Sequence, residues 1–146
     1  EYARVTSGSL SDRIYATHRL RVGAHKVFLS TPKHTAYVAL DYAHDLDTTP
    51  SRLERDEFGA HVGYTYQITD RLKAVLYYHY TYYDYDQAGR EDTNHIHGAE
   101  LYWQLTKSTR LQASFSYVDN DSNLPLNVSD YTSVQGGLGI GFTTKF

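Results

Sequence analysis

The chain has 146 residues, with 17 acidic and 14 basic side chains and a formal net charge of −3 at pH 7. This length suits one domain, residues 1–146, and the charge lacks the basic excess of a nucleic-acid-binding protein. The absence of cysteine excludes a disulfide framework and a zinc–thiolate site. No run approaches the roughly 18 apolar residues of a membrane helix. The mean hydropathy of −0.56 is that of a soluble chain, a test that misses membrane proteins built from alternating strands.

Apolar and polar residues alternate over most of the chain, which predicts β-strands with one face of each kind. The clearest run is 58–68, where the even-numbered residues from Phe58 to Ile68 are apolar or aromatic and the odd-numbered ones are small or polar. In chain order, strands are predicted at residues 2–6, 13–30, 36–43, 58–68, 72–82, 98–105, 110–117 and 133–146. Apolar residues at helical spacing do not persist, so the predicted fold class is all-β.

The predicted connections alternate in length. Short ones lie near 31–34, 68–70 and 106–109, and longer polar ones lie near 7–12, 46–57, 86–93 and 119–130. This pattern predicts a transmembrane antiparallel up-and-down β-barrel of eight strands in four hairpins. The first strand, residues 2–6, is too short to span a bilayer, so the chain is alternatively the C-terminal part of a larger barrel.

Three hairpins resemble one another without gaps. Residues 22–36, 58–72 and 97–111 each begin with an outward-facing residue followed by Gly-Ala. Their starting points differ by 36 and 39 residues, and the differences in length fall in the long connections. The sequence therefore predicts a repeated hairpin, as expected for a ring of similar units.

The last strand alternates apolar residues and ends in an aromatic one. Leu138, Ile140, Phe142 and Phe146 share one face, and glycines fill much of the other. Here the chain resembles bacterial outer-membrane β-barrel proteins, either the small eight-stranded type or a porin-like barrel. The resemblance implies an outer-membrane location, contact with membrane lipids and lipopolysaccharide, and reading of these four residues by the outer-membrane assembly machinery.

Alternation alone does not say which face points outward, and a soluble lipocalin-like barrel would bury its apolar face around a small ligand. Small residues crowd the polar face, which suits the narrow interior of an eight-stranded barrel. Aromatic residues gather at both ends of the apolar face, as in a membrane barrel. The predicted aromatic girdles comprise Phe28, Tyr64, Tyr66, Trp103 and Phe142 near the short turns, and Tyr42, Tyr78, Tyr80, Tyr82 and Tyr117 toward the long loops.

The inward face carries charges that a narrow lumen must pair and hydrogen-bond. The predicted polar network consists of Arg19, Arg21, His25, Asp41, His61, Lys73, Tyr77, His79, Glu100 and Arg110. It either plugs the barrel or lines a narrow path for small solutes. The expected role is structural, surface-binding through the long loops, or a narrow pore.

Other chemistry finds little support in the residue pattern. His95 and His97 share a face and supply half of a metal site, but no third ligand is identifiable. Tyr15, His18, His44, His79 and Ser116 offer catalytic residue types without a recognisable constellation. We therefore expect no catalytic residue, metal or cofactor.

Overall fold

The computed structural model describes residues 16–49, 54–86, 89–124 and 130–142. All of its regular elements are β-strands. They are β1 (Ala16–Ser30), β2 (His34–Thr49), β3 (Arg55–Thr69), β4 (Leu72–Tyr85), β5 (Arg90–Gln104), β6 (Thr109–Ser122) and β7 (Tyr131–Phe142). Among these residues there is no helix long and apolar enough to cross a membrane.

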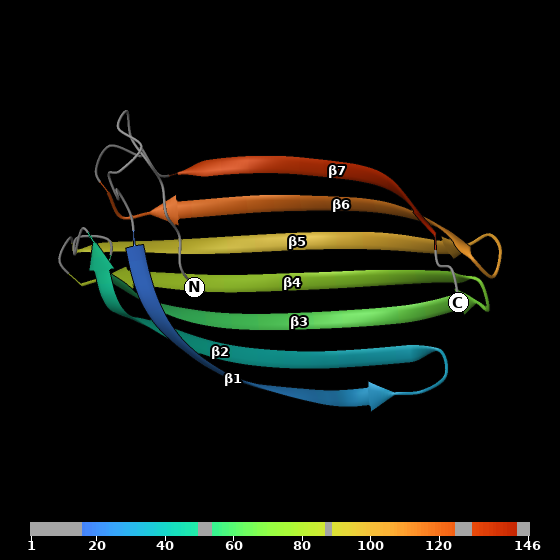
Figure 1. Ribbon diagram of the computed structural model, residues 1–146, viewed down its shortest axis with the longest axis horizontal. Helices are drawn as coiled ribbons and strands as arrows, with labels where there is room; N and C mark the ends of the chain where they lie inside the picture. The colour runs from blue at the N-terminus through green and yellow to red at the C-terminus, as the bar shows by residue number, and fades with distance from the viewer. Residues whose placement is uncertain (1–15, 50–53, 87–88, 125–129, 143–146) are drawn as a thin grey trace.

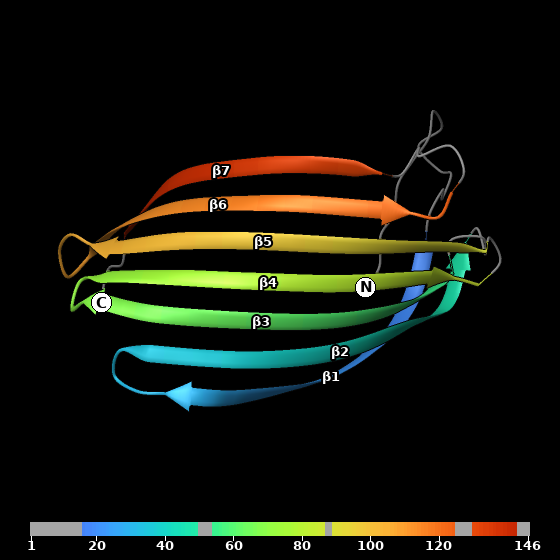
Figure 2. The same ribbon diagram turned by 180° about the vertical axis from the view of Figure 1, so that it is seen from behind.

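The strands form one sheet in which each strand pairs with its neighbour in sequence (Figures 1 and 2). Every pairing is antiparallel, so the predicted all-β, up-and-down topology is confirmed. Seven strands are described, and the predicted strand at residues 2–6 lies outside the described residues. Within the described part of the chain, β1 and β7 are the two edges and the sheet is not closed.

The strands are longer than predicted on the side of the long loops. Residues up to Thr49 and Ser122, and from Arg55 and Arg90 onward, belong to strands, although their polarity had assigned them to loops. The prediction was wrong because polar side chains do not end a strand whose backbone groups stay paired. Tyr85, for example, pairs with Arg55 on one side and Arg90 on the other.

The three short turns fall where they were predicted, and each begins with a threonine. The Oγ1 atoms of Thr31, Thr69 and Thr106 accept the backbone N–H three residues later, at 2.9, 3.1 and 3.0 Å. This hydroxyl-to-backbone bond closes a tight turn without glycine. Thr69 and Thr106 are 37 residues apart, so the last two hairpins do repeat. Their spacing is two residues shorter than the predicted offset of 39.

Strand β1 departs from simple alternation. Its register with β2 shifts between His18 and Arg19, and again between Val27 and Leu29. Such irregularities bend a strand and increase its twist. Figure 1 shows β1 curling from the sheet edge across the front of the other strands, and Figure 2 shows the same end of β1 behind them. The face toward the viewer of Figure 1 is therefore the concave one.

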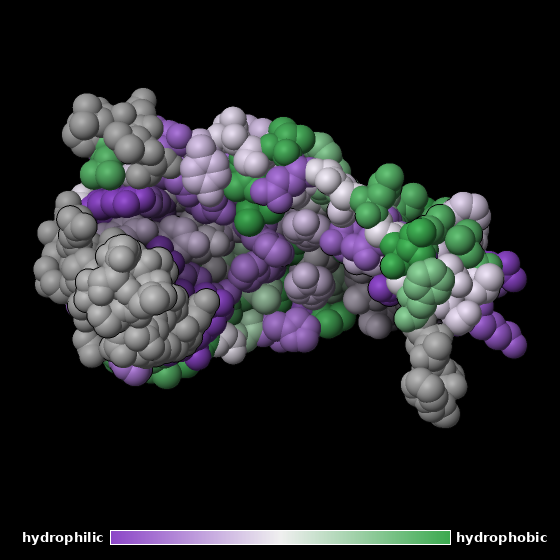
Figure 3. Space-filling model, turned by 45° about the horizontal axis from the view of Figure 1, so that its top comes forward, coloured by the Kyte–Doolittle hydropathy of each residue, from purple (hydrophilic) through white to green (hydrophobic). Residues whose placement is uncertain are grey.

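The concave face is polar and the convex face is apolar. Arg19 on β1 reaches past β2 to Glu57 on β3, which side chains can do only where the sheet curls toward them. On the opposite face, the side chains of Leu76, Leu101, Phe115 and Ile140 are 54%, 42%, 52% and 63% exposed. In Figure 3 hydrophilic residues run along the middle of the molecule, and apolar residues gather at its upper rim and short-turn end. The predicted assignment of the two faces agrees with this geometry, which is opposite to that of a soluble ligand-binding barrel.

Candidate functional site

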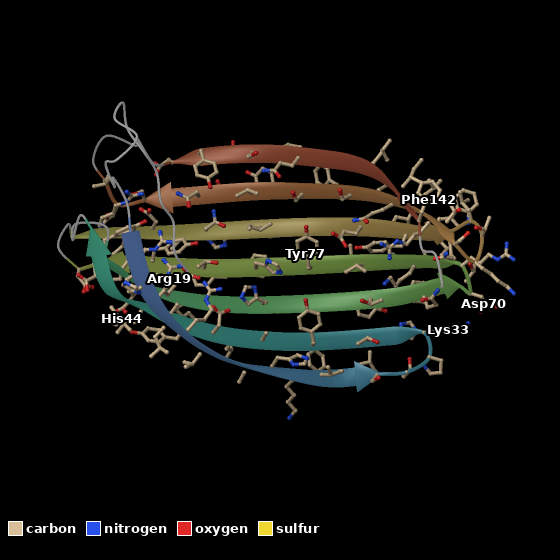
Figure 4. The ribbon with its side chains drawn as sticks, in the orientation of Figure 1. Arg19, Lys33, His44, Asp70, Tyr77 and Phe142 are labelled. Atoms are coloured by element: carbon tan, nitrogen blue, oxygen red, sulfur yellow. The ribbon has the colours of Figure 1, made fainter. Side chains whose placement is uncertain are left out.

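The concave face is the candidate site, and its polar side chains fall into three zones along the strands. Figure 4 shows Arg19 at the end of the sheet with the long loops, Asp70 and Lys33 at the short-turn end, and Tyr77 between them. We call the zones the loop-side cluster, the tyrosine row and the turn-side pocket. Each is defined below by its residues.

The loop-side cluster is built around Arg19. Its Nε donates to Asp45 Oδ1 at 2.7 Å, and its Nη1 donates to Glu57 Oε2 at 3.2 Å. Arg21 also pairs with Glu57 and lies 4.0 Å from Asp41. Asp45 has no exposed surface, so its charge depends on this pairing. Buried charges are tolerated only when paired and hydrogen-bonded, and here three strands supply the partners.

The cluster continues across β3 to β5. The Nη1 of Arg55 donates to the Tyr85 hydroxyl at 2.9 Å, and its guanidinium lies 4.3 Å from the Tyr83 ring centre. Arg90 forms a two-bond pair with Asp92. Burial opposes the charge of Asp92, yet hydrogen bonds from Arg90 and Ser122 hold the pKa of Asp92 below its usual value. These groups border a polar cavity of about 480 Å³.

Two of the predicted lumen histidines meet below this cluster. The Nε2 of His61 lies 2.6 Å from Asp41 Oδ1, and its ring centre is 4.5 Å from that of His79. His25 is on the same face but contacts Tyr37, at 6.0 Å between ring centres. The described residues contain no group of three or more metal-ligating side chains that could hold a metal ion.

The tyrosine row crosses the middle of the sheet. Tyr37, Gly63, Tyr77 and Gly98 are consecutive cross-strand partners on β2 to β5. A Cβ built on Gly63 would lie 2.1 Å from the Tyr37 ring, and one on Gly98 would lie 2.0 Å from the Tyr77 ring. Each ring therefore covers the bare backbone of the next strand, an arrangement that protects glycine in a sheet.

The turn-side pocket lies beyond the tyrosine row. Tyr102 donates its hydroxyl to Glu100. Lys73 Nζ lies 4.6 Å and the Arg110 guanidinium 5.2 Å from the centre of its ring. The cavity here has a volume of about 240 Å³ and is lined by Gln67, Asp70, Arg71, Lys73, Tyr102, Gln104 and Arg110.

The convex face carries nine of the ten predicted girdle residues. Tyr42, Tyr66, Trp103, Tyr117 and Phe142 are exposed there, and Tyr64, Tyr78, Tyr80 and Tyr82 are half-buried. Phe28 is also exposed, but it lies at the register shift of β1, between Val27 and Leu29, where no cross-strand partner assigns it to a face. The two histidines considered for a metal contact tyrosines instead. His95 Nδ1 lies 2.8 Å from the Tyr78 hydroxyl, and the His97 ring lies 4.8 Å from that of Tyr78.

A family model described as Putative beta-barrel porin 2 matches residues 50–143, which is more than half of the chain. The chain belongs to this porin family. The match spans β3 to β7 and with them most of both faces described above. Family membership indicates a membrane location. Neither the curated proteins nor the solved structures contain a significant match to the chain.

The porin-family sheet does not gather the predicted lumen residues into one network. Arg19, Arg21, Asp41, His61 and His79 belong to the loop-side half of the face, whereas Lys73, Glu100 and Arg110 belong to its turn-side half. Tyr77 and His25 lie between the two. The register places Asp41, Tyr77 and Glu100 in three different cross-strand rows.

Several residues of this porin's site were missed by sequence reasoning. They are Tyr37, Asp45, Arg55, Glu57, Tyr83, Tyr85, Arg90, Asp92 and Tyr102. Arg55, Glu57, Arg90 and Asp92 lie in segments that had been assigned to loops. The signal that could have found them is parity: Asp45 continues the inward positions of Asp41 and Ala43, and Glu57 precedes Gly59 on the inward face.

Proposed function

We propose that this porin-family chain is an integral β-barrel of the bacterial outer membrane, with a non-catalytic role as a narrow polar path or structural element. The observation that carries the proposal is the division of the sheet into an exposed apolar convex face and a concave face of paired charges. A soluble protein would have to hide such a large apolar surface. Lipid is the environment that suits it, and the paired charges suit a lumen.

The convex face matches the depth of a bilayer. On β3 the outward residues run from Phe58, which pairs with Tyr42 and Tyr82, to Ile68, a run of eleven residues. A tilted membrane strand needs about 9–11 residues. His44 and Asp56 form the next but one pair of this register beyond Tyr42–Phe58, so they lie outside the proposed membrane-spanning segments.

Trp103 offers a direct test of lipid contact because it is the only tryptophan in the chain and its side chain is 50% exposed on the convex face. In vesicles, we expect its fluorescence to be quenched by lipids brominated on their acyl chains and to be shielded from aqueous iodide. Quenching by iodide without quenching by brominated lipid would contradict membrane integration and would favour a water-soluble barrel.

The strand directions support closure by one further strand. Because successive strands are antiparallel, the two edge strands β1 and β7 run in the same direction. One strand in the opposite direction would pair antiparallel with both, giving the even number typical of bacterial barrels. We propose that the N-terminal segment containing residues 2–6 supplies it.

Amide hydrogen exchange distinguishes a closed barrel from an open edge. In a closed barrel all central amides of β7 are protected, whereas at an open edge every second amide exchanges rapidly. A membrane-integrated chain that shows the alternating pattern would exclude the eight-stranded barrel. It would support the second candidate, a segment of a larger porin, which the open edges of the described sheet also favour.

The loop-side cluster bears on conduction. Charged side chains from β1, β2 and β3 meet there, so an eight-stranded barrel would conduct little. In planar bilayers we expect Asp41→Ala, which removes a partner of Arg21 and His61, to raise single-channel conductance. Unchanged conductance and unchanged stability in both Asp41→Ala and Glu100→Ala would contradict a sealing role.

The proposed partners follow from the same orientation. Membrane lipids and lipopolysaccharide would contact the convex face, and the long loops would form any ligand-binding surface outside the membrane. Leu138, Ile140 and Phe142 are exposed on the outer face of β7, as a segment read by the assembly machinery requires. Phe146 lies outside the described residues.

A further inference from the structure

The cations of the concave face differ sharply between its two ends. Arg19, Arg21, Arg55 and Arg90 of the loop-side cluster all lie within 4.0 Å of a carboxylate. At the opposite end, the turn-side pocket contains Arg71, Lys73 and Arg110. None of these three forms an ion pair with any described residue.

The nearby carboxylates do not neutralise the pocket. Glu100 accepts the hydroxyl of Tyr102 and is not among the lining residues. Asp70 is the one acidic residue of the lining and is exposed to solvent at the turn. Three positive charges and one negative charge therefore line a cavity of about 240 Å³. The carboxylate of Glu100 lies beside it, at Tyr102, and forms no ion pair with any of the three described cations.

The pocket is held in place by its neighbours. Lys73 on β4 and Arg110 on β6 both approach the ring of Tyr102 on β5, at 4.6 and 5.2 Å. Gln67 and Gln104 donate to the turn carbonyls of Thr69 and Thr106, each at 2.6 Å. Such second contacts restrict the lining side chains, which reduces the entropy cost of binding a ligand.

We propose that the turn-side pocket binds a small oxyanion, a phosphate or a carboxylate group, that enters from the short-turn end. The planar guanidinium of Arg110 can donate two parallel hydrogen bonds to such a group, and Lys73 adds a point charge. Lys33 and Lys107 in the neighbouring turns add positive potential that attracts anions toward this end. Only the direction from which the anion enters depends on the proposed barrel; the pocket itself does not.

Phosphate attached to a lipid headgroup has the same chemistry as free phosphate. The lining residues belong to the concave face, however, whereas Trp103 and Leu101 next to Tyr102 point to the convex one. We therefore assign the site to a soluble anion.

The test is titration of the detergent-solubilised full chain with inorganic phosphate at constant ionic strength, followed by the amide NMR shifts of Lys73, Tyr102 and Arg110. We expect saturable binding that Lys73→Gln or Arg110→Gln weakens about tenfold or more, the usual effect of losing a charged hydrogen bond. Lys107→Gln is the matched control: it removes one positive charge at the same end without touching the lining, and we expect less than a twofold change.

Absence of saturable binding by the wild-type chain would overturn the proposal, as would equal weakening by Lys107→Gln. If a glutamine variant does not fold, Lys73→Arg decides: retained binding supports the site and lost binding overturns it. Shifts induced by phosphatidylglycerol bilayers, but not by free phosphate, would overturn the soluble-anion assignment. Trp103 quenching is a separate readout, so failure of the anion site and failure of membrane integration are distinguishable.

Discussion

The ring of Tyr77 lies directly over Gly98 of the neighbouring strand, where a Cβ would come within 2.0 Å of the tyrosine Cζ. We predict that Gly98→Ala lowers the free energy of unfolding by about 1–3 kcal/mol, because the methyl group displaces the ring from the row. Urea unfolding in lipid vesicles or detergent measures this change.

Gly139→Ala is the control for that prediction. Gly139 lies on the same inward face, but a Cβ there meets no atom within 4 Å. We expect this substitution to be neutral or to stabilise the chain by about 0.4–1 kcal/mol, through loss of backbone freedom in the unfolded state. If both substitutions destabilised the chain equally, the contact between the Tyr77 ring and Gly98 would not explain the loss of stability in Gly98→Ala.

Asp45 is the most deeply buried charge of the loop-side cluster, with no exposed surface. We predict that Asp45→Ala costs about 3 kcal/mol of unfolding free energy, because it leaves Arg19 without its 2.7 Å partner. The cost lies at the lower end of the usual range because Glu57 still contacts Arg19. Equilibrium unfolding provides the measurement, with Asp84→Ala as the control: Asp84 is exposed, and a change above about 0.5 kcal/mol there would contradict the role of burial.

Much of the fold followed from one local property, the two-residue period of the side chains. Because period two is tied to the geometry of a strand, the alternation from Phe58 to Ile68 was enough to predict the strand and its apolar face. The threonines of the short turns act through bonds to the next few residues, so the turn positions were also predictable.

The pairing of the inward side chains was not predictable in the same way. It depends on register, which is set by how the strands align across the sheet. The alignment of repeats offset by 39 residues placed Gln67 against Thr106, whereas the turn bonds make Gln104 its equivalent. The ends of the strands were mispredicted for a different reason. Asp45 and Glu57 are polar and resemble loop residues in the sequence, and only the structure shows that both pair with Arg19.

The turn of the β5–β6 hairpin provides a third prediction. The Oγ1 of Thr106 accepts N–H bonds from Ser108 at 3.2 Å and Thr109 at 3.0 Å. We predict that Thr106→Val, which keeps the shape but removes the acceptor, lowers the free energy of unfolding by about 0.5–1.5 kcal/mol. Ser108→Ala removes only a contact with the Thr106 hydroxyl and should cost less. Stability measurements that reverse this order would contradict the role given to the threonine.

The last prediction concerns pH and the pair formed by His44 and Asp56 beyond the aromatic residues of the convex face. His44 Nδ1 lies 2.7 Å from Asp56 Oδ1, which also accepts the hydroxyl of Tyr42 at 2.6 Å. The hydrogen bond to Asp56 is the main cause that raises the pKa of His44 above its usual value of 6.5. The hydrogen bond from Tyr42 comes first, and that from His44 second, among the contacts that lower the pKa of Asp56 below 3.8.

Both shifts favour the folded chain in mildly acidic solution. The contribution of His44 is complete below its unfolded pKa and is lost as the pH rises through the raised folded value, and that of Asp56 is lost as the pH falls through its lowered value. NMR titration of the His44 ring should therefore give a pKa above 6.5, and Asp56→Asn should move it down. Asp86→Asn should move it less, because Asp86 acts on His44 only through its charge. A His44 pKa that does not respond to Asp56→Asn would show that the pair does not form in solution, whatever the state of the rest of the sheet.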